Sequence, residues 1–276
     1  MATGYQPRFQ MDHWSMGTGK SLARRPIEGE GFYPCFAPDG RAVAFRTREG
    51  LAVQDVATGQ ELARIRGELC APFRFSPDGG VLAVASSKPK RPPLPGTSAV
   101  ASVRPDEVEA MILVELATGQ TLLRIDTGPL IPELLTFSPD GRMLATANRD
   151  GITFWDALTG KERFRRPLHE KLHGSLAYSF ASSLAFLPHG DALATGLLDG
   201  TILIWDVPPA IRRVAMPDKD LTPKELERLW SDLAGEDAAK AHQAVGMLAT
   251  APAKAVPFLK DCLLYTSPSP RDRQKS

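Results

Sequence analysis

A five-residue signature, Phe-x-Pro-(Asp/His)-Gly, recurs along this 276-residue chain and limits its possible folds more than any other feature. Proline fixes φ and glycine accepts positive φ, so each copy predicts a tight turn. Successive copies are 39, 62 and 49 residues apart, and a basic period of about 40 residues with two inserts is typical of a repeat architecture. The copies are Phe36-Ala-Pro-Asp-Gly40, Phe75-Ser-Pro-Asp-Gly79, Phe137-Ser-Pro-Asp-Gly141 and Phe186-Leu-Pro-His-Gly190.

A second signature follows each copy of the first. Around the third copy, apolar runs at 135–137, 142–147 and 152–156 and an outer segment at 161–165 predict four strands joined by tight turns. Four such strands make one antiparallel sheet, which buries both faces only when it stacks against similar sheets. The second signature reads Asp55-Val-Ala-Thr-Gly59, Glu115-Leu-Ala-Thr-Gly119, Asp156-Ala-Leu-Thr-Gly160 and, in shortened form, Asp206-Val-Pro208.

Two Trp-Asp pairs, Trp155-Asp156 and Trp205-Asp206, each end an aliphatic strand. With these pairs and the four Phe-x-Pro-x-Gly turns, the chain resembles a WD-repeat β-propeller protein of bacterial type over nearly all of residues 1–216. This resemblance implies an all-β fold, a β-propeller of four-stranded antiparallel blades.

The chain departs from the family pattern in two respects. Gln54-Asp55 and Val114-Glu115 replace the Trp-Asp pair, and the Gly-His pair that usually opens the family's repeat is missing. In the family, that His belongs to a polar network that links a Ser, the Trp and an Asp in the turn between the second and third strands. Asp150 and Asp199 match that Asp here. We therefore expect a simpler buried polar network and more reliance on apolar packing.

The repeat register reaches the N-terminus, because Trp14 to Lys20 aligns with Trp155 to Lys161. We expect the chain to open inside the second strand of a blade, giving one partial blade and about four full ones, with room for a last outer strand at 212–216. Seven blades, the family's commonest number, would need about 280 to 300 residues, and the propeller portion of this chain, residues 1–216, is shorter. We therefore expect a fragment whose first and last sheets each expose an apolar face.

After Pro208-Pro209 the pattern becomes helical. Thr222, Pro223 and Glu225 form a capping-box pattern that predicts the start of a helix ending at Gly235. A second helix is predicted at 236–248, and a third begins at Pro252, with Pro257 kinking or restarting it. Residues 217–261 resemble the helical module that follows WD repeats in some large bacterial proteins, and the beginning of a HEAT-like array.

The segment from Cys262 to Asp272 resembles one reading frame of a transposase-type sequencing-library adapter. We therefore predict that residues 262–276 are a non-native tail, the alternative being a natural Ser/Pro-rich tail. Cys35 and Cys70 then remain, and we expect both to be core thiols. The three cysteines of the whole chain, Cys35, Cys70 and Cys262, cannot form a disulfide framework.

Composition excludes several classes of protein. With 43% hydrophobic residues the chain can bury a core, and 33 Lys and Arg against 32 Asp and Glu argue against a nucleic-acid or polybasic membrane binder. The chain has no run of about 18 apolar residues, so we expect no segment to span a membrane. The N-terminus lacks signal-peptide features. We expect a cytoplasmic location.

Two motifs that carry chemistry in other proteins occur in the wrong context. Gly17-Thr-Gly-Lys-Ser21 imitates the end of a phosphate-binding P-loop, but Trp14 stands where the loop needs glycine, which favours a strand-end turn. His169-Glu-Lys-Leu-His173 has the letters of a zincin motif but lies in a short insert without a third ligand, which favours a solvated loop. We predict no catalytic, cofactor-binding or metal-binding residues.

The inserts are the better binding candidates. The stretch Lys88-Pro-Lys90-Arg91-Pro-Pro-Leu-Pro95 offers a polyproline II ligand or a surface for an acidic partner, the alternative being a mobile loop. Inserts at 86–108 and 168–178 share one face of a meandering blade, so Lys88, Lys90, Arg91, His169 and His173 are candidate partner-binding residues.

The resemblance implies a non-catalytic protein–protein interaction scaffold within a larger protein. The partner is an unknown protein, with no nucleic acid, membrane, cofactor or small-molecule substrate expected. The alternative is a propeller-type enzyme, such as a metal-dependent hydrolase or a lactonase. The residues expected to build the repeat are Trp14, Phe36, Gly40, Phe75, Gly79, Phe137, Gly141, Trp155, Asp156, Phe186, Gly190, Trp205 and Asp206.

Overall fold

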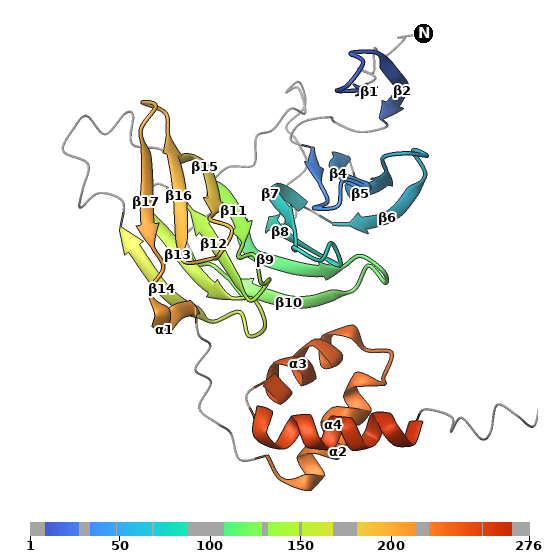
Figure 1. Cartoon of the computed structure of the whole chain (residues 1–276), viewed down its shortest axis with the longest axis vertical. Coiled ribbons are helices and arrows are strands. Elements are labelled where there is room, and N and C mark those ends of the chain that lie inside the picture. Colours follow the sequence, from blue (N-terminus) through green and yellow to red (C-terminus); the bar gives the residue numbers. More distant parts are fainter. Residues whose placement is uncertain are drawn as a thin grey trace, which may run out of the picture. The chain divides into compact units, whose positions relative to one another are not determined.

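A computed structural model shows two compact units, Met1–Val207 and Pro208–Ser276. The first unit holds the described strands and the second holds the described helices (Figure 1). The structure describes residues 9–27, 34–47, 49–67, 69–87, 108–128, 132–148, 151–167, 181–212, 221–249 and 251–266.

The strands form five antiparallel sheets in chain order. A two-stranded sheet comes first, three four-stranded sheets follow, and the last described sheet has three strands. The two-stranded sheet is β1 (Phe9–Trp14) and β2 (Ser21–Ile27). The four-stranded sheets are β3 (Cys35–Phe36), β4 (Ala42–Thr47), β5 (Gly50–Asp55), β6 (Glu61–Arg66); β7 (Leu69–Phe75), β8 (Val81–Ser87), β9 (Val108–Glu115), β10 (Thr121–Asp126); and β11 (Leu134–Phe137), β12 (Met143–Ala147), β13 (Gly151–Asp156), β14 (Glu162–Pro167). The last sheet is β15 (Ala181–Phe186), β16 (Ala192–Leu197) and β17 (Ile202–Asp206).

Each sheet is a simple meander, which confirms the prediction of antiparallel blades. Neighbouring sheets touch through their first strands, β3 against β7, β7 against β11 and β11 against β15, as in part of a β-propeller. The prediction of an outer strand beginning at Arg212 was wrong, because Arg212 ends helix α1 (Pro209–Arg212). Pro209 lacks an N–H and has a fixed φ, which suits the first position of a helix. Residues 213–216 lie outside the described part of the chain.

Both repeated signatures form the predicted turns. In the first signature the glycine has a φ of 71°, 75°, 70° and 68° at Gly40, Gly79, Gly141 and Gly190. The PDG-type turns join the first two strands of the three four-stranded sheets and of the last, three-stranded sheet. The ATG-type turns join the last two strands of the three four-stranded sheets. The turn chemistry is therefore local and repeats with the sequence.

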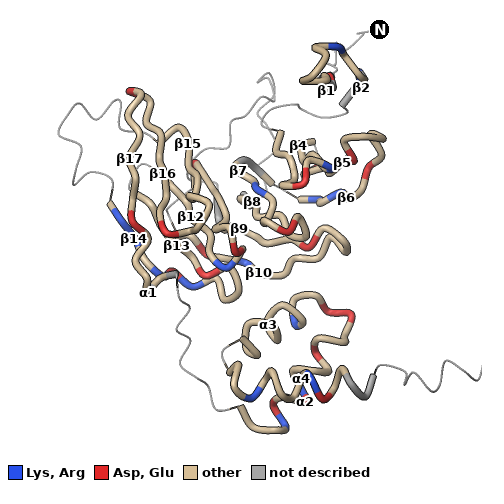
Figure 2. Tube along the Cα trace, in the orientation of Figure 1, with Lys and Arg blue, Asp and Glu red and all other residues tan. Residues whose placement is uncertain are grey.

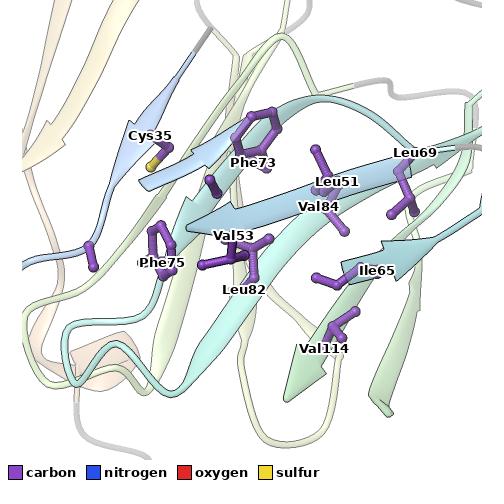
Figure 3. Close-up of a cluster of buried hydrophobic side chains, with 12 residues drawn as sticks. Cys35, Leu51, Val53, Ile65, Leu69, Phe73, Phe75, Leu82, Val84 and Val114 are labelled. Atoms are coloured by element: carbon purple, nitrogen blue, oxygen red, sulfur yellow. The ribbon is translucent and has the colours of Figure 1, made fainter. Parts of the chain in front are cut away.

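Apolar side chains from neighbouring sheets share one core. Leu51 and Val53 of β5 pack with Phe73 of β7 and with Leu82 and Val84 of β8 (Figure 3). All five are at most 1% exposed. Burying each such side chain contributes about 1.5–3 kcal/mol. Packing between neighbouring sheets therefore contributes to the stability of this unit.

The second unit contains α2 (Pro223–Leu233), α3 (Ala238–Ala249) and α4 (Pro252–Thr266). The predicted capping box is present, since Thr222 accepts from the Glu225 amide and the Glu225 carboxylate accepts from the Thr222 amide. Leu226 and Leu229 pack against Leu248 in the core of this unit.

Helix α4 is continuous through Pro257, which stands in its second turn and removes only one backbone hydrogen bond. It runs to Thr266, beyond the predicted end of the helical module at residue 261. None of the helices in the described ranges is long and apolar enough to cross a bilayer.

Candidate functional site

In the second four-stranded sheet, the long connections start at one end of the strands, and the residues at that end form a row across the whole sheet. Leu69, Ser86, Ala110 and Asp126 are successive Cα partners in a row across the sheet. Leu69 begins β7 and Asp126 closes β10, while Ser86 and Ala110 stand beside the connection from β8 to β9. We call this row, and its counterparts in the other sheets, the insert edge.

The third four-stranded sheet has the same geometry. Leu134, Ala147, Ile152 and Arg166 form the corresponding row. Strand β14 therefore ends at the insert edge, at Pro167, and the next strand begins at Ala181. The predicted inserts are thus anchored at the same kind of edge. Their candidate binding residues, Lys88, Lys90, Arg91, His169 and His173, lie outside the described residues.

The opposite edge carries the tight turns, and we call it the turn edge. Its carboxylates are engaged in the turns themselves. Asp78 accepts from the Ser76 hydroxyl and the Gly80 amide, and these hydrogen bonds hold the pKa of Asp78 below its ordinary value. Asp140 likewise accepts from the Ser138 hydroxyl at 2.6 Å. These acidic groups accept hydrogen bonds within their own turns and so stabilise them.

Asp156 is the most buried carboxylate of the turn edge, with 1% of its side chain exposed. Burial raises its pKa, but hydrogen bonds from Arg163 and from the amide and hydroxyl of Thr159 outweigh that effect and lower the pKa overall. The Thr159 amide lies 2.7 Å from Oδ1, and Arg163 Nε lies 3.2 Å from Oδ2. Asp156 therefore joins the turn to strand β14.

The two Trp-Asp pairs carry a polar contact that the sequence interpretation missed. Trp155 Nε1 donates to Thr146 Oγ1 at 2.9 Å, and Trp205 Nε1 donates to Thr195 Oγ1 at 2.9 Å. Each threonine lies on the strand before its tryptophan, in the sequence Leu-Ala-Thr. The repeated Leu-Ala-Thr triplet is the feature of the sequence that could have indicated a threonine partner for each tryptophan. A direct Trp–Thr bond is the simpler network expected without the family's histidine.

The repeat residues do not all have the same surroundings. Phe75 is 6% exposed and Phe137 is 9% exposed, whereas Phe36 at the same motif position is 53% exposed. Trp155 is buried, but Trp14 is 55% exposed. Phe186 packs edge-on against Phe154 of the preceding sheet, with ring centroids 6.1 Å apart.

The tryptophan and aspartate of the last sheet are more exposed than their counterparts. Trp205 is half-buried and lies beneath the Arg166 guanidinium, which is 5.9 Å from the ring centroid. Asp206 is exposed, unlike Asp156.

The P-loop-like segment is a hairpin turn, as its context predicted. The amide of Gly19 donates to the Ser15 carbonyl at 2.7 Å, and Ser21 begins strand β2 rather than a helix. Within the described ranges, no group of three or more His, Cys, Asp or Glu residues is placed to hold a metal ion. Cys35 is a buried free thiol, as expected, and the side chain of Cys70 lies outside the described set.

Charge is distributed over both edges. Lys and Arg, blue in Figure 2, and Asp and Glu, red, both occur along the strands and turns. Strand β14 is the most basic of the outer strands, with Arg163, Arg165 and Arg166. Arg163 and Arg165 each pair with an acidic side chain.

Comparisons with known proteins agree with this strand order. Residues 167–206 match the family described as "WD domain, G-beta repeat" (WD40). The rice (Oryza sativa subsp. japonica) "Small ribosomal subunit protein RACK1y" is 32% identical over 98 residues, which are 35% of this chain and 28% of that protein.

A solved structure, "Kuenenia stuttgartiensis Hydrazine Synthase", is similar in fold, with a TM-score of 0.51 and 19% identity. The match covers 68% of this chain and 49% of that chain. This chain therefore spans about a quarter of the rice protein and about half of the synthase chain. The last described sheet, β15–β17, falls within a WD40 repeat, and it follows sheets of the same strand order.

Proposed function

We propose that this chain is a non-catalytic protein–protein interaction scaffold that binds its partner at the insert edge. The WD40 match supports an interaction role, and so does the partial similarity to a rice protein named as part of the small ribosomal subunit. The proposal includes a cytoplasmic location, with which the free, buried Cys35 thiol is consistent.

The contrast between the two edges carries the proposal. At the turn edge, short connections are closed by hydrogen bonds to Asp78, Asp140 and Asp156. At the insert edge, residues 88–107 and 168–180 separate the flanking strands. Long connections on a rigid sheet scaffold are where binding residues are most often found.

The chemistry of the longer insert indicates an acidic partner surface. Between residues 88 and 105 the sequence has four basic residues and no acidic one, and its first half is rich in proline, which is typical of polyproline II ligands. Lys88, Lys90 and Arg91 are close together in sequence, which favours attraction to clustered carboxylates. Such attraction weakens as salt is added.

The test uses the immobilised full chain as bait in an extract of its source cells. Three baits are compared by quantitative mass spectrometry: the unchanged chain, the insert variant K88A/K90A/R91A, and the turn-edge variant K20A/R41A/K161A. The two variants lose the same charge, so a general electrostatic effect would change both equally. We expect an acidic protein whose capture falls at least several-fold in the insert variant and is retained by the turn-edge variant.

Equal capture by all three baits would overturn the insert edge as the binding site. The enzyme alternative is tested on the same purified chain with lactone and ester substrates and added divalent metals. Turnover above a heat-inactivated control would overturn the non-catalytic part of the proposal.

A further inference from the structure

The last described sheet exposes one apolar face. On β17, Ile202 is 69% exposed and Ile204 is 58% exposed, while Leu203 between them is half-buried. Large aliphatic side chains two residues apart on a strand point to the same side of the sheet. These two isoleucines therefore form a contiguous apolar strip open to solvent.

The same positions are buried in the earlier sheets. Counted back from the aspartate that ends the strand, Ile202 and Ile204 correspond to Leu51 and Val53 in β5. Those two side chains are 0% and 1% exposed. They also correspond to Ile152 and Phe154 in β13, which are 1% and 3% exposed. We call this side of each sheet its forward face.

In the earlier sheets, the following sheet covers the forward face. Leu51 and Val53 share a core with Val84 and Val114 of the next sheet (Figure 3). Met11 of β1, which also occupies a forward-face position, packs against Ala52 and its neighbours in the next sheet. The forward face is therefore built to contact another blade of the same type.

The covering side is also identified by repeat position, and we call it the rear face. Val114 lies on the rear face of its sheet, and Trp205 occupies the same position in the last sheet, where it meets Arg166 of the preceding sheet. The corresponding residue in the first described sheet is Trp14, which is 55% exposed. Leu22 on the adjacent strand is 65% exposed.

We propose that two copies of this chain associate head to tail. The forward face of β15–β17 in one copy, with Ile202 and Ile204, packs on the rear face of β1–β2 in the second copy, with Trp14. The contact continues the interface that already joins successive sheets within the chain. It uses two different surfaces, so each copy retains one open face for a further copy. This inference is independent of the insert edge, and either proposal can fail alone.

Sedimentation velocity of the full chain over a wide concentration range tests the association. We expect the weight-average mass to rise with concentration. The forward variant I202K/I204K and the rear variant W14K should each lose this rise, because each removes one side of the contact. The matched control is L62K, which places Lys at an exposed leucine (56%) of an interior sheet and should associate like the unchanged chain. Far-UV circular dichroism and thermal unfolding check that each variant is folded.

Mixing the two variants distinguishes this arrangement from the others. A forward variant still has an intact rear face, and a rear variant still has an intact forward face, so the mixture should form dimers and nothing larger. A rear variant that associates by itself would indicate pairing of two forward faces and would overturn the proposal. A monomer at every concentration would overturn it as well, and would indicate that the two faces are covered within one chain.

Discussion

The indole Nε1 of Trp155 donates a 2.9 Å hydrogen bond to Oγ1 of Thr146, which joins β13 to β12 in the interior of the third four-stranded sheet. Both side chains are at most 5% exposed, so water cannot readily replace the threonine hydroxyl. A buried indole N–H needs a partner, because leaving it unpaired costs its full desolvation free energy. The equivalent Trp205–Thr195 bond is the same length but joins a less buried tryptophan.

Replacing Thr146 with Val should lower the free energy of unfolding of the β unit by about 1–3 kcal/mol. Valine keeps the shape and the preference for a strand, so the change removes the acceptor of the indole N–H together with the 3.4 Å hydrogen bond that the Thr146 hydroxyl donates to the Thr153 carbonyl. Urea denaturation followed by tryptophan fluorescence measures the effect. Thr195→Val is the matched control and should cost less, because solvent can reach part of Trp205; equal costs would show that burial of the indole is not the cause.

Replacing Asp156 with Asn should destabilise the β unit by about 2 kcal/mol, because Arg163 and the Thr159 turn lose a buried charged acceptor. Denaturant unfolding at neutral pH provides the measurement. Asp206→Asn at the exposed equivalent position should change the stability by no more than about 0.5 kcal/mol. A comparable loss in both variants would contradict the role assigned to burial.

The same carboxylate should make stability depend on pH in the acid range. The pKa of Asp156 is lower in the folded chain than its unfolded value of about 3.9. Its contribution is therefore fully present above that value and is lost as pH falls through the lower folded pKa. The unchanged chain should lose more stability than D156N below about pH 4. Parallel stability curves for the two proteins would contradict this assignment.

Replacing Gly50 with Ala should cost at least about 2 kcal/mol. Gly50 has a φ of 141°, and a Cβ there would lie 2.1 Å from the Ile65 carbonyl oxygen on the adjacent strand. The backbone must move to relieve this contact. Gly80→Ala is the control, because the nearest atom to its Cβ would be an Asp78 oxygen at 3.7 Å and no positive φ is required. Thermal unfolding of the two variants should separate them clearly.

His169 and His173 should not bind zinc tightly, since the sequence around them offers neither a long helix nor a third ligand. The chain is dialysed after exposure to zinc, and retained metal is measured by atomic absorption. We expect less than one equivalent, unchanged in His169→Ala. Stoichiometric zinc that this variant loses would show that the insert is a metal site.

The turns of this protein and the order of its four-stranded sheets follow from the sequence alone. Proline and glycine impose their backbone angles locally, so Phe-x-Pro-x-Gly predicts the turn at Gly79 and at Gly190 equally well. The capping box at Thr222 and Glu225 is another local feature, and it forms as predicted.

Burial, by contrast, depends on the tertiary structure. Phe36 and Phe75 have the same motif position, yet one is 53% exposed and the other 6%, because packing between sheets determines how much of each ring is covered. Ile202 and Ile152 differ in the same way, at 69% and 1%. The Thr146 hydroxyl became identifiable as the partner of Trp155 only when strand register placed the two side chains together. A repeated sequence determines the local conformation of each blade, but the hydrophobic free energy of a side chain depends on which surface lies against it, and only the arrangement of neighbouring sheets decides that.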